Sequence, residues 1–270
     1  MKEISVVVCT LNSEKTIVEC LKSIKENEPL EIILVDGHSQ DRTVEKAKKY
    51  VDKILYDEGK SLAIARNVGL EAAKAKYVIF VGPDNVIPPG FLKKIKTYFV
   101  ENNCSIISSL TLLKDTSSYM GWAQNLYRQK YTPGYKNSVG TPMFGLASLL
   151  KKYKFDPALK WSDDADLCER MAKDGHRFAI SPVICYEIGS TNLKHVFHRW
   201  KMYGESDYLF YKKYAKDWNL KRKIKSFSHP LETEIITTFG KIGFLKSIPI
   251  LPFLVFITLI RYYGWITGRK

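Results

Sequence analysis

A basic, amide-bearing segment lies shortly before a buried strand that ends in a carboxylate. Lys60, Arg66 and Asn67 precede the apolar run Tyr77–Val81, which stops at a Gly-Pro pair followed directly by Asp84. Because proline cannot donate to a strand ladder, we expect Asp84 at the carboxyl end of the strand, where open α/β sheets bind ligands. Cationic side chains neutralise phosphates and a carboxylate binds a divalent cation, so this pattern suits a nucleotide diphosphate. Taken alone, Asp84 could equally cap a turn.

A second acidic cluster opens a predicted helix at residues 163–175. Asp163, Asp164 and Asp166 stand in its first turn, and Gly175 is expected to end it. Burial and neighbouring acids raise a carboxylate's pKa, which suits a general base working near neutrality. The alternative is that these acids only cap the helix and complement its dipole.

Alternating apolar patterns predict a mainly parallel sheet covered by helices on both faces. Strands are expected at 4–9, 31–35, 53–56, 77–81, 105–112 and 178–184, and helices at 13–25, 41–50, 61–75 and 88–101. Residues 113–150 have weak periodicity and are expected to form loops and short helices around a site. Beyond residue 190 the sequence becomes helical, aromatic and basic. We therefore expect an α/β domain at residues 1–190 and a helical extension at 191–270.

The charge of the chain is concentrated at its carboxyl end. The 270 residues carry a formal charge of +14, of which residues 191–270 contribute 15 basic and 5 acidic side chains, or +10. This balance predicts a phosphate-rich partner such as anionic lipid or a lipid diphosphate, unless the cluster is a solvated surface. Nucleic acid is not expected, because the basic residues are mixed with an apolar segment and form no recognition module. The five cysteines show no Cys-x-x-Cys spacing and are expected to be reduced core residues.

Residues 247–260 form an uncharged segment framed by Lys246 and Arg261. Fourteen residues fall short of the roughly 20 that span a bilayer, and Pro249 and Pro252 argue against a straight spanning helix. Aromatic and basic residues follow it, as in interfacial anchors. We expect a membrane-embedded or re-entrant segment, with a buried core helix as the alternative. The apolar run at the amino end is too short for a secretory signal.

Four motifs in order resemble those of family 2 of the inverting glycosyltransferases. They are VVCTLNSE at 7–14 with CLKSI at 20–24, ILVDGHSQDRT at 33–43, the stretch 60–85, and SDDADLCER at 162–170. The resemblance covers about residues 3–205 and implies the GT-A fold, an α/β nucleotide-binding domain with a mixed, mainly parallel sheet. It also implies a nucleotide-sugar donor and a divalent cation, Mn²⁺ or Mg²⁺.

The resemblance assigns roles to residues of each motif. Nucleotide-binding residues would be Thr10, Asn12, Glu14, Asp36, Lys60, Arg66 and Asn67, with Asp84 on the metal and Asp164 as the general base. A carboxylate such as Asp36 can accept the imide N–H of a uracil-type base, and Thr10 and Asn12 can contact base or ribose. Ordinary turns and caps are the alternative for each. Gly59-Lys60-Ser61 is not the end of a Walker loop, because Ile54 occupies the position of its first glycine.

Further residues are expected to contact acceptor or diphosphate: Asn85, Trp161, Asp163 and His195. Trp161 could stack on a sugar or pack as core. His195 and His198 lie three apart in a predicted helix at 192–211, where they could bind metal or diphosphate, or pack in an aromatic face.

The family's metal motif is incomplete here. The triplet matching Asp-x-Asp is Gly82-Pro83-Asp84, so only the last carboxylate is present. A cation completed by phosphate oxygens and water needs few protein ligands. We therefore still expect a metal site, and a non-catalytic nucleotide-sugar-binding homologue is the alternative.

The expected function is metal-dependent inverting transfer of a sugar, from a UDP-sugar, to a hydroxyl of a glycan or lipid-linked acceptor. Such an enzyme would act in polysaccharide or glycoconjugate synthesis at the cytoplasmic face of the membrane, held there peripherally or by the carboxyl-terminal segment. A polyprenyl-phosphate sugar synthase is the nearest alternative, but its anionic acceptor needs no base. A nucleotidyltransferase is disfavoured, because residues 10–15 lack a glycine-rich basic loop.

Overall fold

The computed structural model describes residues 3–159, 161–189 and 191–269. The chain divides into two compact units. The first, the α/β unit, contains Met1–Leu112 and Thr132–Ile188, and the second, the helical unit, contains Leu113–Tyr131 and Gly189–Lys270. The chain passes from the first unit to the second at Gly189. The sequence did not predict that Leu113–Tyr131 belongs to the helical unit.

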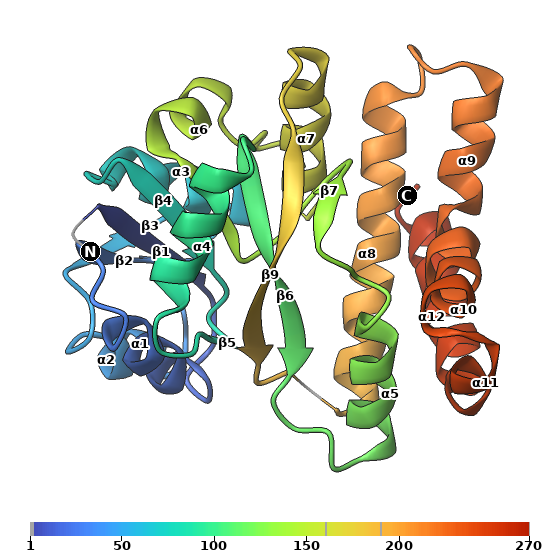
Figure 1. Cartoon of the computed structure of the whole chain (residues 1–270), viewed down its shortest axis with the longest axis horizontal. Helices are drawn as coiled ribbons and strands as arrows, with labels where there is room; N and C mark the ends of the chain where they lie inside the picture. The colour runs from blue at the N-terminus through green and yellow to red at the C-terminus, as the bar shows by residue number, and fades with distance from the viewer. Residues whose placement is uncertain (1–2, 160, 190, 270) are drawn as a thin grey trace. The chain divides into compact units, whose positions relative to one another are not determined.

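A nine-stranded mixed sheet forms the centre of the α/β unit (Figure 1), in the order β3-β2-β1-β4-β8-β6-β9-β5 with β7 paired to β9. The first four strands in this order are parallel: β1 (Ile4–Thr10), β2 (Glu31–Asp36), β3 (Lys53–Tyr56) and β4 (Tyr77–Val81). The others are β5 (Asn85–Val86), β6 (Ile106–Leu113), β7 (Gly134–Lys136), β8 (Met143–Leu146) and β9 (Phe178–Glu187). Strands β8, β5 and β7 each pair antiparallel with a neighbour, so the sheet is mixed, as the predicted fold class requires.

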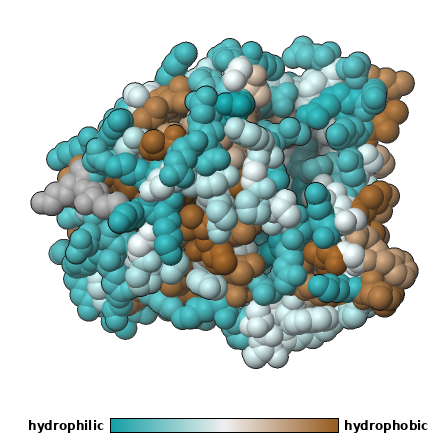
Figure 2. Space-filling view, in the orientation of Figure 1, coloured by the Kyte–Doolittle hydropathy of each residue, from teal (hydrophilic) through white to brown (hydrophobic). Residues whose placement is uncertain are grey.

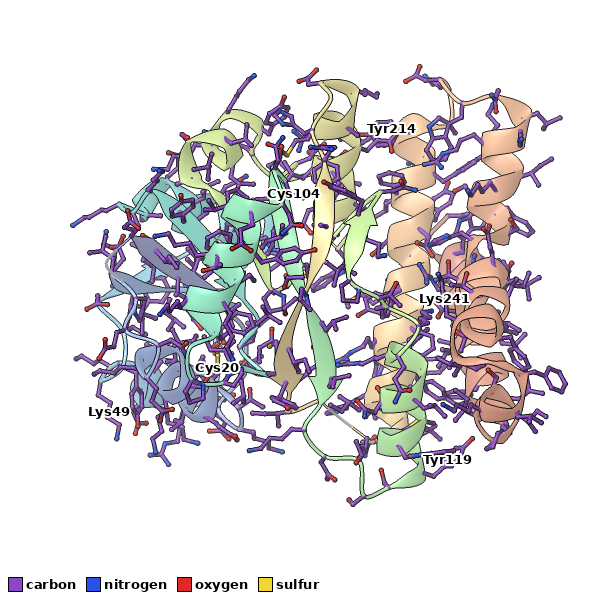
Figure 3. The ribbon with its side chains drawn as sticks, viewed as in Figure 1. Cys20, Lys49, Cys104, Tyr119, Tyr214 and Lys241 are labelled. Carbon is purple, nitrogen blue, oxygen red and sulfur yellow. The ribbon has the colours of Figure 1, made fainter. Side chains whose placement is uncertain are left out.

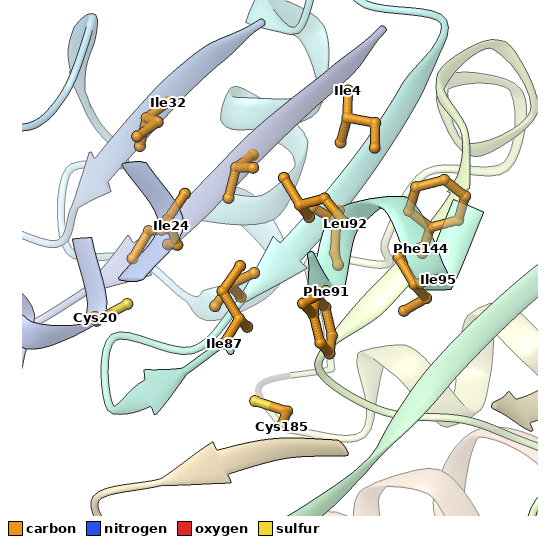
Figure 4. Packing of buried hydrophobic residues seen from close by; sticks show 14 of the residues in the cluster. Ile4, Cys20, Ile24, Ile32, Ile87, Phe91, Leu92, Ile95, Phe144 and Cys185 are labelled. Atoms are coloured by element: carbon orange, nitrogen blue, oxygen red, sulfur yellow. The ribbon is translucent and has the colours of Figure 1, made fainter. Parts of the chain in front are cut away.

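Helices cover both faces of this sheet. Successive side chains of a strand point to opposite faces, and the apolar strand β1 therefore presents apolar side chains to both. Ile4, Val6 and Val8 pack in one cluster with α1 (Ile17–Lys25), α2 (Thr43–Ala47) and α4 (Phe91–Glu101), part of which is drawn in Figure 4. Val7 packs on the opposite face with α3 (Leu62–Ala72), α6 (Ala147–Tyr153) and α7 (Asp163–Lys173). Both faces are therefore buried, as expected for a doubly covered sheet.

Local hydrogen bonds explain where helices start later than expected. Helix α1 was expected from residue 13, but the Ser13 hydroxyl donates to the Leu11 carbonyl at 3.2 Å instead of capping the helix, which begins only at Ile17. Helix α4 was expected from residue 88 and begins at Phe91, because Gly90 has a φ of 75° and interrupts the helical backbone. Helix α3 starts close to the expected position, capped by the Ser61 hydroxyl, which accepts from the Ile64 N–H at 3.3 Å.

The helical unit is built on two long helices, α8 (Leu193–Tyr214) and α12 (Leu251–Thr267). Around them lie α5 (Tyr119–Arg128), α9 (Leu220–Leu231), the π-helical turn Glu232–Ile236, α10 (Thr237–Ile242), α11 (Phe244–Ser247) and the 3₁₀ turn Ile248–Ile250. Glycines allow α8 and α12 to approach closely, since a Cβ on Gly264 would lie 2.0 Å from the Lys201 carbonyl oxygen. Tyr214 marks the end of α8 in Figure 3.

The apolar segment near the carboxyl end differs from its expected form. Phe244–Thr267 runs as one helical stretch of 24 residues, because Pro249 lies in the 3₁₀ turn and Pro252 in the first turn of α12, where the missing N–H costs nothing. Among the described residues it is the one helix long and apolar enough to cross a membrane, judged by length and composition alone, and 39% of its most apolar window is buried inside the protein.

Candidate active site

The carboxyl ends of the parallel strands bring the first predicted residues together. Thr10 is the register partner of Asp36, and Asp36 is in turn the partner of Tyr56. Neighbouring strands lie about 4.8 Å apart, so these three residues line one edge of the sheet. The Thr10 hydroxyl is buried and has no hydrogen-bond partner among the residues that the structure describes. A buried hydroxyl without a partner suits a ligand contact at this edge.

Asp36 fixes the turn that follows β2. Its side chain is fully buried, and its two carboxylate oxygens accept from the backbone N–H and the hydroxyl of Ser39, at 2.8 Å and 2.6 Å. A carboxylate has about four lone-pair positions, so acceptor capacity is left for a further donor.

Asn12 and Glu14 join the loop after β1 to the loop after β2. The Asn12 N–H donates to the Ser39 hydroxyl at 2.9 Å, and its side-chain oxygen accepts from the Gln40 N–H at 2.8 Å. Glu14 accepts from the Arg42 N–H at 3.3 Å. Both predicted nucleotide-binding residues therefore brace the loops of this edge against each other.

Lys60 and Asn67 lie on either side of the start of α3. Lys60 forms an ion pair with Glu58 at 2.5 Å, and more than half of each side chain is exposed. The Asn67 amide donates to the Phe155 carbonyl at 2.8 Å and accepts from the Phe155 N–H at 2.9 Å. Asn67 thus holds a loop of its own chain, and its contact with a nucleotide stays a prediction.

Arg66 and Asp163 form a buried ion pair between α3 and the start of α7. One guanidinium nitrogen donates to Asp163 Oδ2 and another to Thr141 Oγ1, each at 2.7 Å. The two charged side chains are 7% and 1% exposed, and the Phe155 ring lies under the guanidinium, 5.2 Å away. The other Asp163 oxygen, Oδ1, is buried without a hydrogen-bond partner among the described residues. The pair therefore neutralises two buried charges but leaves one acceptor unsatisfied.

Asp164 stands next to this pair in the first turn of α7. Dense protein surroundings and the neighbouring Asp163 charge raise the pKa of Asp164 to about 6, against the opposing influence of Arg66. Its Oδ1 accepts from the Ala165 N–H at 2.7 Å. Gly140 leaves room beside the other oxygen, since a Cβ there would lie 3.1 Å from Asp164 Oδ2. The carboxyl group is partly accessible, as a proton acceptor must be.

Cys9 places the ion pair near the end of β1. Burial raises the pKa of Cys9 to about 12, and the charges of Arg66, Asp163 and Asp57 also act on its thiol. Cys9 directly precedes Thr10, the last residue of β1. The start of α7, although more than 150 residues later in the chain, therefore lies at the same edge of the sheet as the predicted nucleotide-binding residues.

Asp84 follows β4 in a tight turn. The Asn85 side-chain oxygen accepts from the Gly82 N–H at 3.0 Å, and the Cys20 thiol of α1 (Figure 3) lies 3.3 Å from the Gly82 carbonyl. A Cβ on Gly82 would lie 3.0 Å from Oδ1 of both Asp84 and Asn85, so glycine leaves the space that these oxygens occupy. Asn85 is buried in this turn, whereas Asp84 is half-buried.

The residues around Asp84 fit a divalent cation only if the ligand completes its coordination. No group of three or more His, Cys, Asp or Glu side chains able to hold a metal occurs in the described parts of the chain. Hard cations such as Mg²⁺ bind through one or two carboxylates together with substrate phosphates and water. Asp84, half-buried beside a glycine that adds no side chain, would supply one such carboxylate.

Two further predicted contact residues are exposed. Trp161 precedes α7 and is 42% exposed, so it is not a core residue. His195 lies exposed on the first turn of α8, in the helical unit. The sequence did not single out Thr141, which accepts a hydrogen bond from Arg66, or Ser39, which donates two to Asp36. Thr141 lies within the irregular stretch 113–150 that was expected to surround a site, but no local pattern singled it out.

Comparison with known sequences settles the family. Residues 5–156 match the sequence profile of "Glycosyl transferase family 2", which is more than half of the chain. The chain belongs to this family. It is 31% identical over 117 residues to the poly(ribitol-phosphate) beta-N-acetylglucosaminyltransferase TarP of Staphylococcus aureus, and 28% identical over 125 residues to the putative glycosyltransferase EpsH of Bacillus subtilis. These matches cover 40% and 43% of this chain and 36% of each relative, so the chain matches about a third of their length.

Solved structures that superpose on this chain confirm its GT-A fold. A mannosyltransferase from Pyrobaculum calidifontis, solved with GDP-Man and Mn²⁺, superposes with a TM-score of 0.70 at 14% identity, covering 99% of this chain and 88% of that one. TarS 1–349 of S. aureus, solved with UDP-GlcNAc, gives a TM-score of 0.56 at 17% identity and covers 99% and 90%. The expected resemblance and the mixed-sheet fold class are both correct.

Replacement of Arg66 tests whether the buried pair supports the site. Arg66→Gln leaves Asp163 as an unpaired buried charge and should lower the free energy of unfolding by about 3–5 kcal/mol. Arg42→Gln is the matched control, because it breaks an exposed pair with Glu45 and should cost no more than about 1 kcal/mol. Urea denaturation measures both values. Equal losses in the two variants would contradict the assignment.

Proposed function

We propose that this family 2 chain transfers a sugar from a nucleotide diphosphate to a hydroxyl acceptor, with inversion at the anomeric carbon. The observation that carries the proposal is Asp164, a partly accessible carboxyl with a pKa raised to about 6, beside the edge of the sheet where ligands of such folds bind. A base with this pKa is mostly ionised at neutral pH and still basic enough to accept a proton.

The proposed reaction is one displacement. Asp164 takes the proton of the acceptor hydroxyl while that oxygen attacks the anomeric carbon, and the bond from this carbon to the diphosphate oxygen breaks on the opposite face. The nucleotide diphosphate leaves with the bonding electron pair, and the proton remains on Asp164. Arg66 and Asp163 act by holding the start of α7, as their 2.7 Å contact supports.

A UDP-sugar is the proposed donor. Asp36 retains acceptor capacity beyond its two contacts with Ser39, which suits an imide N–H, and the buried Thr10 hydroxyl lies beside it in the sheet. Roles for Asn12, Glu14, Lys60, Arg66 and Asn67 in donor binding remain part of the proposal. The solved complex of TarS with UDP-GlcNAc supports uracil as the nucleobase of the donor, although UDP-GlcNAc is a ligand of TarS.

Asp84 would hold Mn²⁺ or Mg²⁺, with the oxygens of the donor diphosphate completing the coordination. Such a cation would neutralise charge on the leaving diphosphate. The mannosyltransferase solved with GDP-Man and Mn²⁺ supports a divalent cation in this fold.

We further propose a glycan or lipid-linked acceptor at the cytoplasmic face of the membrane. TarP acts on a poly(ribitol-phosphate), by its name, and the helix Phe244–Thr267 is apolar enough to associate with a membrane. A hydroxyl acceptor is favoured over a polyprenyl phosphate, because an anionic phosphate needs no base and would gain nothing from Asp164.

Asp164→Asn tests the base. Transfer should fall by about 10²–10⁴-fold, the usual contribution of a general base, while UDP binding measured by calorimetry stays within twofold. The variant should also be more stable at pH 7.5, by on the order of 1–2 kcal/mol, since an acid with a raised pKa resists ionisation in the folded state. Unchanged turnover would refute the assignment.

The pH dependence of transfer follows from the same group. Below about pH 6 Asp164 is protonated and cannot accept a proton, so kcat/KM should rise about tenfold per pH unit up to about 6 and then level off. Initial rates between pH 4.5 and 8 measure the profile. A profile already level at pH 4.5 would show that no group with this pKa acts as the base.

Asp84→Asn tests the metal site separately from the base. Calorimetric titration with UDP should show tighter binding in the presence of Mn²⁺ for the natural chain, and at least about a tenfold smaller Mn²⁺ effect for the variant. Asp217→Asn removes an equal charge at an exposed turn of the helical unit and should leave the Mn²⁺ effect unchanged. An undiminished Mn²⁺ effect in Asp84→Asn would place the cation elsewhere.

A further inference from the structure

Helix α9 turns its apolar side outward. Leu220, Ile224, Phe227 and Leu231 are spaced at i, i+4, i+7 and i+11, which is one side of a helix, and they are 73%, 60%, 52% and 44% exposed. A helix that folds onto its own protein buries such a stripe. In the space-filling view, brown apolar side chains gather along the right-hand edge, over the helical unit (Figure 2).

The same helix is strongly basic. Between residues 220 and 231 it carries four cations and no acid: Lys221, Arg222, Lys223 and Lys225. An exposed apolar stripe flanked by lysine and arginine is the pattern of a helix lying in the interface of an anionic bilayer. Each such cation near the surface of an anionic membrane contributes on the order of 1 kcal/mol.

Helix α12 adds a second exposed apolar stripe. Its members recur every three or four residues and are 38–63% exposed: Leu251, Val255, Leu259, Tyr263 and Ile266. The two helices touch through aromatic rings, since the Phe227 ring centroid lies 5.6 Å from that of Tyr262 and 5.4 Å from that of Trp265.

The opposite side of α12 is committed to its own unit. Phe253, Leu254 and Ile257 are buried against residues of α5 and α8. Arg261 forms a two-point ion pair with Asp207 of α8, at 2.6 Å and 2.9 Å, and also contacts Glu234. A helix crossing a bilayer would have to give up these contacts, so α12 is suited to lie along the membrane surface.

A pocket of about 310 Å³ lies between α8, α9 and α12. Its lining is aromatic and aliphatic with one cation: Tyr211, Lys223, Ile224, Phe227 and Trp265. The indole N–H of Trp265 is buried and has no hydrogen-bond partner among the described residues, and Arg269 lies 4.3 Å from the Trp265 ring. The Lys223 ammonium beside apolar walls matches a phosphate group joined to the first part of a hydrocarbon chain.

We infer that the stripes of α9 and α12 lie in the interface of an anionic bilayer, and that the α8–α9–α12 pocket binds the phosphate end of an anionic phospholipid. This deepens the membrane placement that is part of the proposed function. It does not depend on the transfer reaction.

Vesicle sedimentation of the full chain tests the inference. The chain should bind vesicles of phosphatidylcholine with phosphatidylglycerol at least about tenfold more tightly than pure phosphatidylcholine, because α9 brings Lys221 and Lys223 to the flanks of its apolar stripe. Ile224→Glu/Phe227→Glu should lower binding to the anionic vesicles by about tenfold or more, and Leu259→Glu tests α12 independently. Val100→Glu, at a residue of α4 that is 61% exposed, is the matched control and should change nothing.

The charge and the pocket are tested by Lys223→Gln, which should weaken binding to the anionic vesicles about fivefold. Lys93→Gln, at an exposed lysine of α4, is its control. Thermal melting and UDP binding of each variant show whether the fold and the donor site are intact. Three results would each overturn the inference: failure of the natural chain to bind anionic vesicles, binding of a stripe variant as tight as that of the natural chain, or resistance of the bound chain to alkaline extraction. If the natural chain binds anionic vesicles but does not bind UDP, the result would count against the proposed function and not against this inference.

Discussion

The buried ion pair between Arg66 and Asp163 is the contact on which the candidate site depends. It joins α3, which packs against β1 and β2, to the first turn of α7, 97 residues further along the chain. Buried charges are tolerated only when paired, so the pair fixes where α7 begins. Asp164 is the next residue. Its raised pKa comes first from its dense surroundings and then from the Asp163 charge, and Arg66 keeps that pKa from rising further. The pair thus holds the proposed base in place, while burial is the main cause of its raised pKa.

Much of the α/β unit was predictable because its signals are local. The runs that became β1, β2 and β4 are apolar and end in polar residues, and parallel strands place those residues at one edge by geometry alone. Asp36 and Asp84 were singled out for this reason, whereas Asp164 was singled out by the acidic cluster that opens a predicted helix and by the family resemblance. Helix starts were less predictable: Ser13 was a reasonable cap, but its hydroxyl donates to the Leu11 carbonyl and α1 begins only at Ile17.

Long-range partners account for the other differences. Arg66 and Asn67 are predicted to bind a nucleotide, and that stays a prediction, but their contacts with Asp163, Thr141 and Phe155 could not be read from the local sequence. The stretch Leu113–Tyr131 gave no sign that it would join the helical unit, since only packing against later helices decides that. In residues 247–260 the two prolines predict a break in the helix. Both lie where a helix tolerates proline, and the segment is one continuous helical stretch. One side of this helix packs on α8, and the other side is exposed.

The account is tested most directly by the ionisation of Asp164 itself. Carboxyl ¹³C resonances of aspartate, followed by NMR as a function of pH in the natural chain and in Asp164→Asn, would report it without any assay of transfer. We predict one aspartate that titrates near pH 6 and is absent from the variant. If every aspartate resonance that disappears in the variant titrates below about pH 4.5, near the ordinary value, then Asp164 is not the tuned base that the buried pair is proposed to create.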